Sequence, residues 1–202
     1  MKGILLLNGE PYLDKINDKN AVVYCCDGAY IWAKDRVKID KNIGDFDSLN
    51  IIPVPAPEEI YPSEKDYTDG EIALKKLIER GVDEVEIYGG FGGRSDHFLG
   101  NLHLLMLAHK RGVKCKMVSE KEEIIIASGK SELLNLNGKT VSVLPFGGDL
   151  HIIEAEGLKY SYPQKITYGE CRGVSNVIIN NSAHVTFAEG DCALIIINKD
   201  TV

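Results

Sequence analysis

The first 119 residues alternate short apolar runs with segments of helical period, and this alternation limits the folds open to the chain. Five runs have the length and side chains of strands: Gly3 to Leu7, Ala21 to Cys26, a short piece ending near Ile43, Val85 to Tyr88, and Lys114 to Val118. Strands that alternate with helices need crossover connections, which make a sheet parallel. We therefore expect an α/β domain whose ligands bind outside the carboxyl ends of its strands.

Two segments between these runs predict helices. The first spans Glu71 to Arg80 and stops at Gly81, and the second spans Asp96 to Lys110 and stops at Gly112. Helical spacing selects the side chains that should face the sheet. They are Leu74, Leu77 and Ile78 in the first helix, and Phe98, Leu99, Leu102, Leu105 and Met106 in the second.

The pattern changes after about residue 120. Six short, β-branched segments follow, separated by Gly, Asn and Asp and without a helical period, at 122–128, 139–145, 150–155, 175–180, 184–190 and 191–198. They predict an all-β domain, a sandwich or a partial barrel. We expect two domains, an α/β domain over residues 1–120 and a β-sandwich over residues 121–202.

Charge and cysteine content narrow the function classes. The net charge of −7 disfavours a nucleic-acid partner, because binding to a polyanion needs a clustered Lys/Arg surface. Five cysteines without a CxxC pair fit neither a disulfide framework nor a zinc ribbon, and they favour a reducing cytosol. The N-terminal apolar stretch is too short for a signal peptide, and no run approaches the roughly 18 apolar residues of a membrane span. We expect a soluble cytoplasmic protein.

Four segments place aspartate beside glycine: CCDGAY (25–30), IGDFDS (43–48), EKDYTDGE (64–71) and YGGFGGRSDHFLGNL (88–102). Asp27, Asp45 and Gly89 each follow a predicted strand, so three of the four segments should meet at one edge of the sheet. Glycine lets backbone N–H groups approach phosphate, and carboxylates bind hard cations. The combination suggests a magnesium-dependent reaction on a nucleotide.

The acidic segments allow two interpretations. Asp45 and Asp47 point the same way in extended backbone, which suits Mg²⁺, but a polar turn with local hydrogen bonds explains the pair equally well. Asp69 directly precedes an amphipathic helix, so it is either an N-cap or a third oxygen ligand at the helix start, and both could hold.

The glycine-rich segment is the most informative one. Its glycines follow a strand and precede a helix, so the backbone can wrap an anion, and Arg94 can fork onto phosphate. A glycine turn without a ligand does not explain why Arg94, Asp96 and His97 follow at once. The spacing is not that of the dinucleotide motif GxGxxG, and no GxxxxGK[ST] occurs, so an ordinary P-loop enzyme is excluded.

At these motifs the chain resembles the thiamine pyrophosphokinases (thiamine diphosphokinases) of the bacterial type. The matching segments are DGA at 27–29, GDFDS at 44–48, KDYTD at 65–69, GGFGGRSDHFLGNL at 89–102, EGLKYSYP at 156–163 and GVSNVI at 173–178. They span nearly the whole chain in the family's order. The resemblance implies an α/β domain followed by a β-sandwich, and a homodimer whose active sites lie between subunits.

The resemblance also implies a reaction and its residues. The terminal two phosphates of ATP move to the hydroxyethyl oxygen of thiamine, giving thiamine diphosphate and AMP. Mg²⁺ would be held by Asp45, Asp47 and Asp69, which with Arg94 and Asp96 form the catalytic set. The implied ATP contacts are Asp27, Gly28, Lys65, Thr68, Gly89, Gly90, Gly92, Gly93, Arg94 and His97, and the implied thiamine contacts are Asp96, Tyr160, Ser175 and Asn176. Asp96 either orients the thiamine alcohol or joins the metal shell.

Two rival functions remain at this stage. One is a diphosphokinase on the same scaffold that acts on another aromatic alcohol, such as a hydroxymethylpterin. The other is a nucleotide or thiamine sensor without turnover, which the separate acidic motifs and Arg94 disfavour because a sensor needs no multi-carboxylate metal site.

Overall fold

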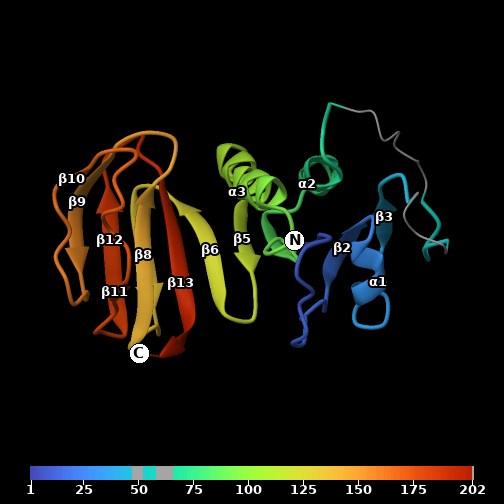
Figure 1. Ribbon diagram of the computed structural model, residues 1–202, viewed down its shortest axis with the longest axis horizontal. Coiled ribbons are helices and arrows are strands. Elements are labelled where there is room, and N and C mark those ends of the chain that lie inside the picture. Colours follow the sequence, from blue (N-terminus) through green and yellow to red (C-terminus); the bar gives the residue numbers. More distant parts are fainter. Residues whose placement is uncertain (47–51, 58–65, 202) are drawn as a thin grey trace. The chain divides into compact units, whose positions relative to one another are not determined.

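The computed structural model describes residues 1–46, 52–57 and 66–201, and these form two compact units, Met1–Glu120 and Lys121–Val202. Figure 1 shows both units, with most of their elements labelled. Each unit has its own hydrophobic core.

The first unit contains a five-stranded parallel sheet. Its strands lie in the order β5 (Lys114–Val118), β4 (Glu84–Tyr88), β1 (Lys2–Leu6), β2 (Ala21–Cys26) and β3 (Lys41–Ile43), and every neighbouring pair is parallel. Strand β1 is central, since the chain runs from it to β2 and β3 on one side and returns to β4 and β5 on the other. The predicted α/β fold is confirmed.

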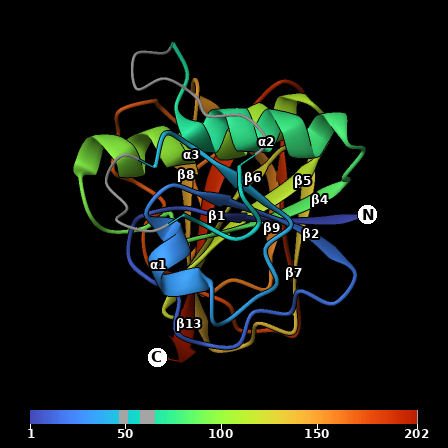
Figure 2. The same cartoon turned by 90° about the vertical axis from the view of Figure 1, so that its right-hand side faces the viewer.

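Helices cover both faces of this sheet, which gives three layers (Figure 2). Side chains alternate along a strand, so Ile4 and Leu6 face α1 (Ala29–Ala33) and share its hydrophobic cluster. Gly3 faces the other side, where a Cβ would lie 3.4 Å from Leu77 of α2 (Asp69–Glu79). Helix α3 (Ser95–Lys110) lies on the α2 side. Helix α1 was missed because it is only five residues long.

Helix α3 follows its predicted range and buries Leu102 and Leu105 as predicted, but the rest of its buried side differs from the prediction. Leu104 is buried, whereas Leu99, expected to face the sheet, is 58% exposed. The segment carries apolar residues almost all the way round, so periodicity alone could not select the buried side. None of the helices among the described residues has the length and apolar character of a membrane span.

The second unit is the predicted β-sandwich, built from two antiparallel sheets. One follows the order β11 (Asn176–Val177), β8 (Lys139–Pro145), β13 (Ala193–Thr201), β6 (Glu122–Ala127), and the other β10 (Lys165–Ile166), β9 (Leu150–Glu156), β12 (Ser182–Phe187), β7 (Lys130–Leu134). Val143 and Ile195 of the first sheet share one buried cluster with Leu150 and Val185 of the second. This shared core makes the two sheets a sandwich.

Candidate active site

The carboxyl edge of the parallel sheet collects the acidic and glycine-rich segments. Asp27 follows β2, Asp45 follows β3, and the loop 89–94 follows β4. Between β1 and β4 the strand order reverses, and the crevice outside such a switch point is where open α/β sheets bind ligands. The strand order therefore brings these segments to the expected edge.

Asp27 and Asp69 come together at this edge although 42 positions separate them in the chain. Burial, a hydrogen bond with Asp69 and the charges of Asp69 and Asp45 raise the pKa of Asp27 to about 7. The backbone N–H of Phe46 donates to Asp27 Oδ1 at 3.3 Å and opposes this rise. The edge is thus crowded with carboxyl groups from three separate segments, the loops after β2 and β3 and the first residue of α2.

This donor set fits a hard cation, because the meeting groups are carboxyl oxygens and their crowding is relieved by positive charge. Within residues 1–46, 52–57 and 66–201 no three acidic, histidine or cysteine side chains form a closed metal cage. Asp47, predicted as a ligand, and Lys65, predicted as an ATP contact, lie outside the described residues. The fit therefore depends on the chemistry of Asp27, Asp45 and Asp69.

The start of α2 resolves the two interpretations of Asp69. Thr68 is the N-cap, and its Oγ1 accepts a hydrogen bond from the Glu71 N–H at 3.2 Å. Asp69 is the first helical residue, so the N-cap interpretation of Asp69 is wrong. Because Thr68 satisfies the helix end, the Asp69 carboxyl is left to meet Asp27.

The four glycines of the loop after β4 divide into two pairs. Gly89 and Gly90 are buried, and a Cβ would lie 2.1 Å from the Leu7 carbonyl oxygen at the first and 2.3 Å from Met117 Sδ at the second. Close packing explains glycine at both positions, and at Gly89 a φ of 70° favours it as well. Gly92 and Gly93 are exposed with φ of 68° and 66°, so they form the part of the loop that can approach an anion.

Arg94 forks onto Asp96 at the start of α3. Its Nε and a terminal nitrogen donate to the two Asp96 carboxyl oxygens at 3.1 and 2.6 Å. The Arg94 guanidinium holds the pKa of Asp96 below its usual range. Both side chains are exposed, as is His97, so an incoming phosphate can displace the Asp96 carboxylate from Arg94.

The second unit brings Tyr160, Ser175 and Asn176 together. Asn176 is buried, and its side-chain amide accepts from the Tyr160 N–H at 3.0 Å and donates to the Tyr160 carbonyl at 2.7 Å. Tyr160 as a residue remains 54% exposed. Ser175 has φ of 59°, and its N–H donates to Ser142 Oγ at 3.0 Å. Asn176 thus fixes the backbone of Tyr160, and the Tyr160 ring is the group presented to solvent.

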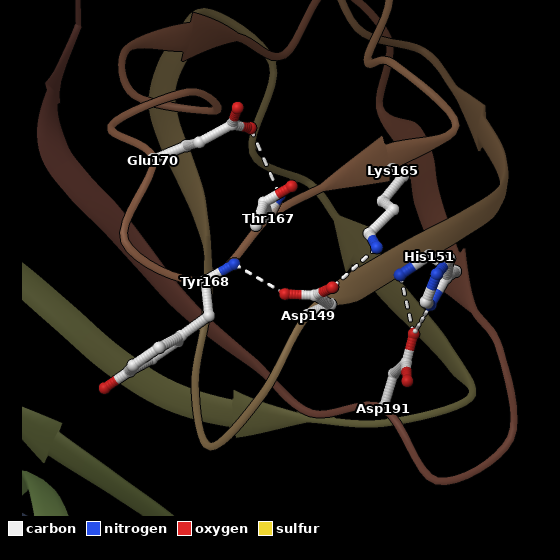
Figure 3. Close-up of polar contacts among 7 residues, drawn as sticks. All are labelled: Asp149, His151, Lys165, Thr167, Tyr168, Glu170 and Asp191. Atoms are coloured by element: carbon white, nitrogen blue, oxygen red, sulfur yellow. Dashed lines mark hydrogen bonds and ion pairs between the residues drawn. The ribbon is translucent and has the colours of Figure 1, made fainter.

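A polar network that no sequence motif indicated fixes residues 165–170 of the second unit (Figure 3). Asp149 pairs with Lys165 at 2.6 Å and accepts from the Tyr168 N–H at 2.8 Å. Glu170 accepts from the Thr167 N–H at 3.1 Å. These contacts hold residues 165–170 against the turn before β9, while the Tyr168 ring points away from the network.

Trp32 of α1, which the sequence analysis did not single out, packs at the carboxyl edge of the parallel sheet. Its Nε1 donates to the Leu7 carbonyl at 3.3 Å, and a Cβ on Gly89 would come within 3.1 Å of its ring. Trp32 therefore supports the switch point from the α1 side. The sequence feature that could have pointed to this residue is that it is the only tryptophan of the chain and lies soon after the DGA segment.

Fold and edge together define a two-domain α/β protein with an acidic site and a glycine-rich loop of the kind that binds phosphate. Comparison with known proteins gives the family. Residues 13–117 match the family model "Thiamin pyrophosphokinase, catalytic domain", and residues 123–191 match "Thiamin pyrophosphokinase, vitamin B1 binding domain". The chain belongs to the thiamin pyrophosphokinase family.

Individual relatives agree with this assignment. A thiamine pyrophosphokinase of Bacillus subtilis (strain 168) is 34% identical over an alignment of 161 residues, and the match covers 75% of this chain and 75% of that one. The crystal structure of thiamine pyrophosphokinase from Bacillus subtilis matches with a TM-score of 0.84 at 27% identity, covering 98% of this chain and 99% of that one. A family protein from Enterococcus faecalis, 22% identical with a TM-score of 0.84 and full coverage of both chains, shows the same fold.

Proposed function

We infer that this chain is a thiamine diphosphokinase, which transfers the diphosphate group of ATP to the hydroxyl of thiamine and releases AMP. The observation that carries this inference is the meeting of Asp27, Asp69 and Asp45 at the carboxyl edge, beside a glycine-rich loop. Both family matches support it, and they favour neither the pterin enzyme nor the sensor.

We propose Mg²⁺ as the cofactor, held by Asp45, Asp47 and Asp69 with Asp27 beside them. The carboxyl crowding that raises the pKa of Asp27 supports this set, because a cation would relieve it. The chemistry supplied by the bound ion is neutralisation of charge on the phosphates.

The residues of the chain then have separate tasks. The exposed amides of Gly92 and Gly93 and the guanidinium of Arg94 would bind phosphate oxygens, with Arg94 exchanging Asp96 for phosphate. Once released from Arg94, Asp96 can orient the thiamine alcohol. The alcohol oxygen attacks the β-phosphorus and gives up its proton to solvent, while the bond from that phosphorus to the α-phosphate oxygen breaks and AMP leaves with the bonding electron pair. Positioning therefore matters more than covalent catalysis.

Thiamine would stack on the exposed side chain of Tyr160, whose backbone Asn176 holds by two hydrogen bonds. We further propose a homodimer with active sites between subunits, as the family resemblance implies. Exposed apolar side chains such as Ile153 and Val174 support a contact surface in the second unit. We propose the cytoplasm as its location, and the five free cysteines are compatible with a reducing compartment.

The test is release of AMP from ATP and Mg²⁺, with and without thiamine. We expect AMP and thiamine diphosphate in equal amounts, and neither product without thiamine. AMP formed only with a hydroxymethylpterin would support the pterin enzyme, and thiamine or ATP binding without any AMP would support the sensor. Either result would overturn the proposed function.

A further inference from the structure

The segment after the central strand β1 lies along the glycine-rich loop. The N–H groups of Leu7 and Gly9 donate to the carbonyls of Tyr88 and Gly89, both at 2.8 Å, and the Glu10 N–H donates to the Phe91 carbonyl at 2.7 Å. Residues 8–10 therefore border the switch point between β1 and β4 directly. They precede the part of the chain matched by the family model, which begins at residue 13.

Asn8 in this segment packs onto Gly28. A Cβ built on Gly28 would lie 2.4 Å from Asn8 Nδ2 and 2.8 Å from Asn8 Oδ1. Gly28 has φ of −60° and ψ of −13°, a conformation that any residue adopts. Glycine at position 28 is therefore explained by the approach of the Asn8 amide and by nothing in the local backbone.

The Asn8 amide is exposed, and none of the hydrogen bonds reported for residues 1–46, 52–57 and 66–201 uses it. Asn8 lies just after the carboxyl end of the central strand β1, with the Asp27 loop after β2 on one side and the glycine-rich loop after β4 on the other. Its –NH₂ group is a donor without net charge, which suits a phosphate oxygen placed between carboxylates and backbone amides.

We propose that Asn8 contacts the nucleotide, its side-chain amide donating a hydrogen bond to a phosphate oxygen of the nucleoside triphosphate, and that Gly28 leaves room for this amide. This inference rests on the function proposed above. With this role, Asn8 would affect the binding of the nucleoside triphosphate and not the binding of thiamine.

The decisive variant is Asn8→Asp, which keeps the shape of the side chain and replaces the donor by a negative oxygen. If Asn8 donates to phosphate, Asn8→Asp weakens ATP binding by about 10- to 100-fold and more than Asn8→Ala does, because a charge-assisted hydrogen bond is replaced by repulsion. The KM for thiamine stays within about twofold, since removing a phosphate contact acts on one substrate. Isothermal titration calorimetry with ATP and Mg²⁺ measures the binding, and a thermal melt confirms the fold.

Asn17→Asp is the matched control. Asn17 is exposed, and its carbonyl accepts from Lys2 at the amino end of β1, so this variant adds the same charge at the opposite end of the sheet. We expect its ATP affinity to equal that of the wild type. Equal affinity in Asn8→Asp and wild type would overturn the proposal, because packing on Gly28 or binding of a metal by the side-chain oxygen tolerates aspartate.

Gly28→Ala tests the link between the two residues. The added methyl must push the Asn8 amide aside, so Gly28→Ala should lower ATP affinity to the level of Asn8→Ala, and the double variant should lose nothing further. Additive losses would overturn the pairing. Wild-type protein that binds ATP but makes no thiamine diphosphate would contradict the proposed function alone, because ATP binding still reports on Asn8.

Discussion

Two acidic residues of the first unit, Glu86 and Asp27, have neighbours of opposite charge. Glu86, in the middle of the sheet, is 8% exposed and pairs with Lys2 at 2.5 Å and Lys116 at 3.3 Å, and it accepts from the Tyr88 hydroxyl at 2.8 Å. Asp27, at the carboxyl edge, meets the carboxyl of Asp69 and the charge of Asp45. One carboxylate is neutralised by the chain's own lysines, and the other is surrounded by further acids.

The pKa values follow this difference. Burial alone would raise the pKa of Glu86, but hydrogen bonds from Lys2 and Tyr88 and the charge of Lys116 outweigh burial and hold it below the ordinary value. Burial and neighbouring acids raise the pKa of Asp27 to about 7. A carboxylate paired with cations favours the folded state, whereas crowding of carboxylates opposes it, and this difference is the reason for proposing a positively charged ligand at the Asp27 edge.

The largest effect should come from Asp69→Asn. Removal of one carboxylate from the acidic edge should lower kcat by at least about 100-fold, because charge on the transferring phosphates is left less neutralised. The melting temperature in EDTA should not fall, since Thr68 still caps α2. Steady-state AMP release and thermal melts measure the two quantities.

Asp66→Asn is the control for this variant, since Asp66 is exposed and lies three positions earlier. We expect its kcat to match the wild type. Normal turnover in Asp69→Asn at saturating Mg²⁺ would remove Asp69 from the proposed metal site.

Glu86→Gln should show the reverse pattern, a loss of stability without loss of activity. Two lysines would face a neutral side chain in a mostly buried place, which should lower the free energy of unfolding by about 2 kcal/mol. Urea titration in EDTA measures it, and kcat of the folded variant should equal the wild-type value. Glu84→Gln, on the exposed start of the same strand, should change neither quantity. A drop in kcat for Glu86→Gln, without one for Glu84→Gln, would contradict the assignment of Glu86 to stability and of Asp27 to activity.

The stabilisation by Glu86 should also depend on pH. Because its folded-state pKa lies below the ordinary value of 4.5, this stabilisation is fully present above about pH 4.5 and is lost as the pH falls through the folded-state pKa. The stability difference between wild type and Glu86→Gln should therefore be constant from pH 8 to pH 5 and shrink at lower pH. A difference that grew on acidification would show that the lysine pairs do not control this carboxyl.

The smallest effect is expected for Asp27→Asn, with a sign opposite to that of Glu86→Gln. Removing one of the crowded charges should raise the free energy of unfolding in EDTA at pH 8 by up to about 1 kcal/mol, a modest figure because Asp27 is partly open to solvent. Turnover should fall. If Asp27→Asn destabilised the protein as Glu86→Gln does, the negative charge of Asp27 would have to be balanced by positive groups of the protein itself, and the contrast with Glu86 would be wrong.

Local sequence patterns determined the two folds and the position of most acidic residues of the candidate site. Alternating periods predicted the parallel sheet and then the sandwich, and strand ends at Cys26 and Ile43 placed Asp27 and Asp45 at one edge, because backbone periodicity and crossover geometry are read over a few residues at a time. The glycine-rich loop and the acidic motifs identified the family before any coordinate was needed, and the family matches agree.

Tertiary structure decided which side chains meet. Nothing local to Asp27 reveals Asp69 as its partner, and only packing shows that Asn8 requires Gly28, that Leu104 and not Leu99 faces the sheet, and that Asn176 serves the backbone of Tyr160. These pairings join segments far apart in the chain. Their energy comes from burial and close approach in the folded state, which no window of neighbouring residues contains.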